Sequence, residues 1–315
     1  MALGALGYVG YGVEVTEGTQ VAPTKYLPVT SFSFEDSNDF IVPSQIRHSR
    51  DTYIAMAAPY AVSGSAEMEL IPNDVASLLR SGFAATVVTS AYAGGGYQHV
   101  YTPASAEPTF TFESSASDIL IMRYGGSRVN TIEIKAAFGE IVMATFGLEG
   151  VNRTKQGSAS SPTYTNVVPF HFSGVDIKVE GGTLLTTVKD FTFGVNNNIE
   201  RIGTLRKTRS WKRLELGMRE VSLALTIDFA DTAEYDRFLN ETIFDVDLHM
   251  QGPVLATMTN PSALRVEIPN VRWNKVGIPL AAGDYLEQSV EALIVAPIGG
   301  DVFTATLVNN EAVVD

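Results

Sequence analysis

Six basic residues gather in thirteen positions of an otherwise acidic chain, from Arg201 to Arg213. Such a cluster can bind phosphate groups, and the tryptophan within it could stack on a base. It can also dock onto an acidic surface of a neighbouring subunit, or remain a solvated loop without a partner. Because the corresponding segment earlier in the chain has only two arginines, we favour subunit docking. The candidate docking residues are Arg47, Arg50, Arg201, Arg206, Lys207, Arg209, Lys212 and Arg213.

The residues that usually carry catalysis are not arranged for it. The four histidines are scattered, without the spacing of a metal site. The glycine-rich segment at 7–12 lacks the surrounding βαβ unit of a dinucleotide site, and the glycines at 94–96 lack the lysine of a phosphate-binding loop. Glu67 and Glu69 share one strand face, which in principle suits a glycosidase, but no aromatic platform alternates beside them. We therefore expect no enzyme, no metal and no cofactor.

Composition describes a folded, acidic protein. The chain has 315 residues, is 45% hydrophobic and 18% charged, and carries a net charge of −13. The acidity is even: residues 1–158 hold 9 basic and 15 acidic side chains, and residues 159–315 hold 13 and 20. This charge opposes tight binding to a phosphate backbone. The chain has no cysteine, which excludes disulfides and fits a reducing compartment. Its first twelve residues resemble neither a signal peptide nor a spanning helix.

The segment 29–83 is repeated at 188–242, and the residue numbers keep one constant offset. The strand VTSFSFED corresponds to VKDFTFGV, Asn38 corresponds to Asn197, and the paired arginines follow at the same spacing. Agreement at every step predicts a duplicated domain. We expect the first domain at 1–160, with an N-terminal arm, and the second at 161–315, with a C-terminal arm.

The clearest elements are two alternating strands, at 62–70 and 221–229. Apolar and polar residues alternate in both, which predicts half-buried antiparallel strands. Their polar faces carry Glu67, Glu69 and Asp228, and a short amphipathic helix follows each strand. We expect a long loop at 36–60, a first-half elaboration at 84–118 and a linker at 152–165. Further strands are expected at 119–124, 129–135, 140–148, 263–269 and 286–295. The fold class is therefore mainly β.

Several stretches resemble the tail tube, or major tail, proteins of long-tailed bacteriophages of the siphophage type. They are GYGVEVTEGTQVAPTKYLPVTSFSFED, Ile46-Arg47, YAVSGSAEMELIPNDVASLLRSGF, VVPFHFSGVDIKVEGG and VKDFTFGVNNNIE. The resemblance covers most of the chain. It implies two tandem tail-tube-like β-sandwich or barrel domains, each with one short flanking helix.

The resemblance also implies a function. Domains of this family stack as rings around a channel that conducts double-stranded DNA, and strands of adjacent subunits join into one barrel. The resemblance implies rings of six domains, so with two domains per chain we expect a homotrimeric, pseudo-hexameric ring. We expect Glu67, Glu69 and Asp228 to face its lumen. The implied partners are further copies of the chain, the tape measure protein, and the tail terminator and baseplate proteins. Double-stranded DNA would pass through the tube transiently and without specific binding, and no membrane partner is implied. The tube would be part of the virion and would be assembled in the cytoplasm of the bacterial host.

Two alternatives remain open on sequence grounds. One is another tail component, such as a terminator, baseplate or decoration protein. The other is a carbohydrate-binding or carbohydrate-active β-sandwich, for which exposed aromatic platforms near a carboxylate pair would be typical. Trp211 and Trp273 instead lie in basic surroundings.

Overall fold

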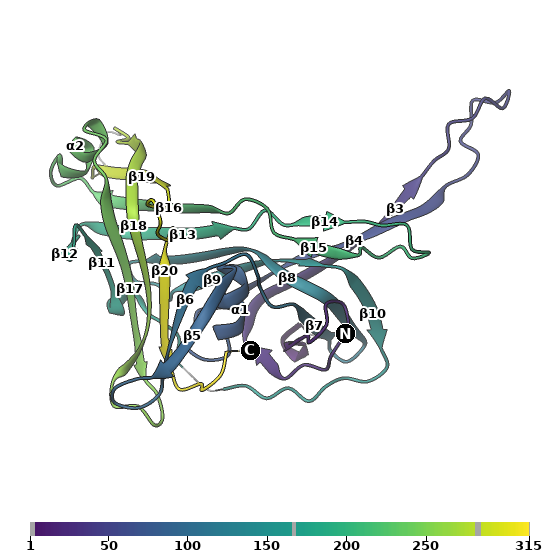
Figure 1. Ribbon diagram of the computed structural model, residues 1–315, viewed down its shortest axis with the longest axis horizontal. Coiled ribbons are helices and arrows are strands. Elements are labelled where there is room, and N and C mark those ends of the chain that lie inside the picture. Colours follow the sequence, from purple (N-terminus) through teal and green to yellow (C-terminus); the bar gives the residue numbers. More distant parts are fainter. Residues whose placement is uncertain (1–3, 166–167, 281–284, 315) are drawn as a thin grey trace.

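The alternating segments of the sequence form antiparallel strands in the computed structural model, which describes residues 4–165, 168–280 and 285–314 (Figure 1). The elements of the first half are η1 (Gly4–Leu6), β1 (Tyr8–Val13), β2 (Lys25–Leu27), β3 (Val29–Ile41), β4 (Met56–Glu69), α1 (Ala76–Gly82), β5 (Ala85–Ala91), β6 (Tyr97–Pro103), β7 (Phe110–Ala116), β8 (Leu120–Ala137), β9 (Met143–Gly150) and β10 (Asn152–Gln156).

The second half repeats much of this series. Its elements are η2 (Phe172–Gly174), β11 (Val175–Val179), β12 (Thr183–Leu184), β13 (Val188–Asn196), β14 (Glu200–Ile202), β15 (Arg213–Glu215), β16 (Glu220–Asp228), α2 (Ala233–Leu239), β17 (Phe244–Val254), β18 (Pro261–Gly277), β19 (Glu287–Ile294) and β20 (Thr304–Asn309). The mainly β fold class with two short helices is confirmed.

One layer, here named the main sheet, combines four strands from each half. Its order is β3–β4–β9–β8–β13–β16–β19–β18, with every neighbouring pair antiparallel. The two halves meet where β8 pairs with β13, from Thr131 opposite Asn196 to Ala137 opposite Asp190. The main sheet is therefore continuous across the middle of the chain.

The second layer is built on the other ends of the two longest strands. Before β8 enters the main sheet it pairs with β7 and β10, and β1 pairs with β7 and β2. In the same way β18 pairs with β17 and β20, and β11 pairs with β17 and β12. The β5–β6 hairpin of the first half joins the second half, because β6 pairs with β20.

The layers enclose an apolar core in which α1 is almost fully buried. Leu78 and Leu79 of α1 have no exposed surface, and the nearby rings of Phe83, Tyr101 and Phe303 are equally buried. α2 instead lies on the surface, where Leu239 is 60% exposed. The two helices thus occupy comparable places in the chain but different environments. The layers form a sandwich; the described strands do not close into a barrel.

The strand irregularities of the two halves coincide. The β3–β4 register shifts between Val29 and Ser31, and the β13–β16 register shifts at the corresponding place, between Val188 and Asp190. The β8–β9 register shifts after Val129, and the β18–β19 register shifts after Trp273. Bulges bend a strand and are retained as specific features of a fold. The halves therefore agree in local detail as well as in strand order.

The expected loop at 36–60 is partly wrong, because β3 continues to Ile41 and β4 begins at Met56, which leaves only residues 42–55 outside the strands. The two strands form a hairpin that projects from the body at the upper right of Figure 1. Residues 36–41 are all exposed, so no alternation marked them as strand. The expected linker is also partly wrong, since residues 152–156 form β10. The segment expected as an N-terminal arm contains β1 and β2.

Candidate functional site

The solvent side of the main sheet is a polar face made largely of small hydroxyl residues, glycines and charged side chains. Glu67 and Asp228 are exposed on it and Glu69 is half-buried, whereas their neighbours Met68 and Ile227 point into the core. Across β3 and β4, opposite serines approach to 3.2 Å between hydroxyl oxygens. The three predicted carboxylates therefore share one continuous surface, named here the polar face.

Carboxylates outnumber lysines on the polar face. Lys189 contacts Glu287 at 2.7 Å and Asp228 at 3.8 Å, and Lys275 pairs with Glu291. The hydrogen bond to Glu133 raises the pKa of Lys135. The carboxylates include Glu67, Glu69, Glu133, Asp228, Glu287 and Glu291, against Lys135, Lys189 and Lys275. The face is net negative, and its lysines are held by acidic partners.

The main sheet has two open edges. Strand β3 pairs with β4 on one side, and within the described residues nothing pairs with its other side. At the opposite end, residues 272–277 of β18 pair with β19, again with no described strand on the other side. Open edges present backbone N–H and C=O groups that can pair with another chain.

Two arms project from the same end of the main sheet (Figure 1). The first arm is the β3–β4 hairpin with its tip at 42–55, and the second is the segment 198–219 with β14 and β15. The second arm lies on the base of the first. Arg209 Nε donates to the carbonyl oxygen of Ala58 at 2.7 Å, and Trp211 Nε1 donates to that of Tyr60 at 2.8 Å.

The eight predicted docking residues are divided between these arms. Arg201 pairs with Glu149 and also reaches the carbonyl of Val62. The guanidinium of Arg47 lies 3.3 Å from the ring centroid of Tyr53, in the first arm. Arg201 and Arg209 therefore bind across to other parts of the chain. The remaining predicted residues lie at exposed positions along the arms: Arg50, Arg206, Lys207, Lys212 and Arg213.

An asparagine pair fastens the junction between the two halves. Asn130 lies in the β8 bulge, where its Oδ1 accepts from Ile199 N and its carbonyl oxygen accepts from Asn197 N, both at 2.8 Å. Asn197 is 1% exposed, and its Nδ2 donates to the carbonyls of Gly82 at 3.0 Å and Val129 at 3.1 Å. The repeat had marked Asn197 but not Asn130. The missed signal was the recurrence of Arg-x-Asn at 128–130 and 272–274, which does not follow the offset of the first repeat.

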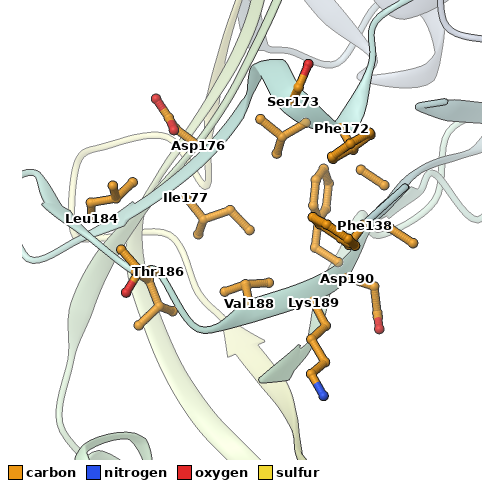
Figure 2. A pocket seen from close by; sticks show the side chains of 15 residues that line it. Phe138, Phe172, Ser173, Asp176, Ile177, Leu184, Thr186, Val188, Lys189 and Asp190 are labelled. Carbon is orange, nitrogen blue, oxygen red and sulfur yellow. The ribbon is translucent and has the colours of Figure 1, made fainter. Parts of the chain in front are cut away.

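An apolar groove of about 370 Å³ lies beside the start of β13. Figure 2 shows Phe138 and Phe172 gathered at one end, while Lys189 and Asp176 point away from the interior. The two phenylalanine rings meet edge to face, with centroids 5.0 Å apart. The groove has no set of converging polar groups of the kind that orients a small substrate.

Two features are absent from the described part of the chain. Within it, no three His, Asp or Glu side chains gather in an arrangement that could hold a metal ion. None of its helices has the length and apolar character needed to cross a bilayer.

Comparison with known proteins gives one family match. A family model described as phage tail tube protein matches residues 4–292. No match was found among curated proteins. The matched range includes the main sheet, both arms and both helices, apart from the last residues of β19.

Proposed function

The chain belongs to the phage tail tube protein family, and from this premise we propose that it polymerises as stacked rings into a tube that conducts double-stranded DNA. Its family makes it a structural component of the phage tail, in a class of proteins that are not normally enzymes. The observation that carries the proposal is the continuous main sheet, which is polar on one side and open at both edges.

The two halves are proposed to be one duplicated domain, divided near residue 160. Each half contributes four strands to the main sheet in the same order, β3–β4–β9–β8 and β13–β16–β19–β18. The repeated bulges support this equivalence. Since β8 pairs with β13 inside the chain, the equivalent free strand β18 would pair with β3 of the next subunit. Strand addition of this kind satisfies both open edges.

Repetition of this step closes a ring. If the chain behaves as two equivalent domains, three chains supply six domains in a pseudo-hexameric ring. The polar face would then line the lumen, with Glu67, Glu69 and Asp228 toward the DNA. A negative wall repels the phosphate backbone, so the duplex slides rather than binds. The tape measure protein would occupy this lumen during assembly, and the terminator and baseplate proteins would close the tube ends.

The register of the β8–β13 pairing inside the chain predicts the register of the proposed β18–β3 pairing between subunits. Asn197 N bonds to the carbonyl of Asn130, so the next pair, Thr131 and Asn196, is a non-hydrogen-bonded antiparallel pair. The Cα atoms of such a pair lie about 4.5 Å apart, within the range that a disulfide spans. The equivalent pair across subunits is Lys275 and Ser37.

The experiment exploits the absence of native cysteine. A variant with Lys275→Cys and Ser37→Cys is assembled, oxidised and run on a non-reducing denaturing gel. We expect covalent trimers as the largest species, because three disulfides close the ring. The matched control, Thr131→Cys with Asn196→Cys, should form its disulfide within single chains.

Three outcomes would contradict parts of this proposal. Covalent species beyond the trimer would contradict the trimeric ring, and tubes without any cross-link would contradict the register. Failure of the wild-type protein to form rings or tubes at high concentration, seen by negative-stain microscopy, would contradict the proposed function.

A further inference from the structure

The junction inside the chain shows how two domains are fastened at a bulge. Asn130 holds the segment that follows β13 through two acceptors, its side-chain Oδ1 for Ile199 N and its carbonyl oxygen for Asn197 N. Asn197 in turn donates its Nδ2 to the carbonyl of Val129, beside the bulge, and to that of Gly82 at the end of α1. Two asparagines thus join a bulge, a strand end and a helix end.

The same residue types stand at the open edges. Asn274 occupies the β18 bulge after Trp273, as Asn130 occupies the β8 bulge after Val129. In the repeated segments, Asn38 of β3 corresponds to Asn197, which follows β13. Both edge asparagines are exposed, whereas Asn197 is buried. The two asparagines of the internal junction therefore have counterparts at the two open edges of the main sheet.

The surroundings of Asn274 match those of Asn130. α2 packs against β18 beside Asn274, where Trp273 Nε1 donates to Glu234, as α1 packs against β8 beside Asn130, where Val129 N donates to Ser81 Oγ. α1 is covered by the body of the protein, but α2 leaves Tyr235 36% and Leu239 60% exposed. An apolar helix end beside an open strand edge is a surface suited to a second copy of the chain.

We propose that Asn38 and Asn274 form a lock between adjacent subunits, equivalent to the internal pair Asn197 and Asn130. Asn274 accepts the N–H of Phe40 of the next subunit at its Oδ1, and the N–H of Asn38 at its carbonyl oxygen. The Nδ2 of that Asn38 donates to the carbonyl of Trp273 and to the last carbonyls of α2. This inference rests on the proposed ring and adds the residues that fix its boundary.

The existing contacts of Asn38 leave this role intact. Arg153 and Arg209 each donate to Asn38 Oδ1 at 3.1 Å. The proposed contact uses the Nδ2, the atom through which Asn197 acts. The second arm, which supplies Arg209, would therefore orient the Asn38 amide for the neighbour without competing for its donor.

The test compares edge and internal asparagines in the full chain. Asn274→Ala should leave the thermal midpoint of the monomer unchanged, and Asn38→Ala should change it little, because the bonds that it loses to Arg153 and Arg209 are exposed. Both variants should raise the critical concentration for assembly about 10- to 100-fold, since the ring buries the groups that lose their partner. Asn197→Ala, the internal control, should lower the monomer midpoint. Sedimentation gives the critical concentration, and calorimetry gives the midpoint.

Aspartate variants identify the atoms. Asn274→Asp keeps the Oδ acceptor and should assemble nearly as the wild type does. Asn38→Asp replaces the Nδ2 donor by an acceptor and should fail, although it strengthens the contact with Arg209. Wild-type tubes together with normal assembly of both alanine variants would overturn the lock and leave the proposed function standing. Failure of the wild-type protein to assemble would overturn both.

Discussion

Among single residues, Glu107 is a buried carboxyl close to the contact between the two halves of the chain. Its side chain has no exposed surface, Ser81 Oγ donates to Oε2 at 2.8 Å, and Arg128 Nη1 lies 3.7 Å from Oε1. Its pKa is raised to about 7, chiefly by burial and also by nearby Glu17, while Ser81, Arg128 and Arg219 act in the opposite direction. Arg219 belongs to the second half and donates to the carbonyls of Ala84 and Ala104.

Glu107→Gln should change how monomer stability depends on pH. A carboxyl whose pKa is raised in the folded state binds its proton more tightly there than in the unfolded chain. Its contribution is fully present below about pH 4.5 and is lost as the pH rises through about 7. Relative to the wild type, the glutamine variant should therefore gain up to about 3 kcal/mol between pH 5 and pH 8. Urea unfolding across this range measures the gain.

The control for this measurement is Glu133→Gln, whose side chain is 42% exposed on the polar face. It removes one negative charge without removing a buried carboxyl, so it separates the effect of net charge from the effect of the buried group. Because other groups that titrate remain in both proteins, the difference between variant and wild type isolates Glu107. Parallel curves for Glu107→Gln and the wild type would contradict the assignment.

Among the elements, the second arm depends on a few contacts with the first. Besides the Arg209 and Trp211 bonds, the backbone N of Tyr60 donates to the carbonyl of Arg209 at 3.3 Å. The segment carries basic residues at 201–213 and is largely exposed. Its order thus depends on docking against the first arm and, at Leu214, against the body, rather than on a core of its own.

Trp211→Ala should release the second arm without unfolding the body. The substitution removes the Nε1 bond to Tyr60 and the packing of the indole, so the arm opens more often. We expect trypsin to cleave between residues 201 and 213 about tenfold faster, with little change in the thermal midpoint. Mass spectrometry of timed digests locates the cuts. Met218→Ala, at a side chain 85% exposed in the same arm, is the control and should be cleaved at the wild-type rate.

An element could be predicted from the sequence only where the local alternation of apolar and polar residues reflects its burial. Strands with one buried face, such as β4 near Met68 and β16 near Leu225, can be recognised from their alternation. The outer part of the β3–β4 hairpin cannot, because its residues from Asp36 to Ile41 are exposed. The pairing of β8 with β13, and of β6 with β20, joins residues far apart in sequence, which local pattern cannot reveal.

For the candidate site, the sequence located the carboxylates but not their setting. Glu67, Glu69 and Asp228 do lie on a polar sheet face, as the alternation predicted. Asn274 was not identified, because the halves differ in length before the bulge and the offset between them changes there. The basic cluster suggested docking but not that Arg201 and Arg209 would bind inside the chain.

For the whole molecule, the distribution of charge sets what an assembled tube can conduct. The chain carries −13 overall, and on the polar face carboxylates outnumber lysines, each of which contacts an acidic partner. In a ring this face would be repeated around a narrow space, where fields from several subunits add. The proposed lumen is thus a repulsive wall with small hydroxyl side chains.

Reversal of the charge on the polar face should convert the proposed lumen from a surface that repels DNA into one that binds it. Glu67→Lys, Glu69→Lys and Asp228→Lys together reverse the charge at three positions of the polar face in every chain. Neighbouring lysines bind phosphates by releasing counterions, so a short duplex should be retained in pelleted tubes and freed by salt. Retained DNA should resist DNase, because the tube wall encloses it.

The matched control reverses three carboxylates outside the main sheet: Asp176→Lys, Glu241→Lys and Asp301→Lys. These residues are exposed, so any DNA that this variant holds should lie on the outside and be digested. Wild-type tubes should retain neither DNase-resistant nor digestible DNA. If the polar-face variant held only digestible DNA, the polar face would lie on the outer wall, and the orientation of the main sheet in the tube would have to be reversed.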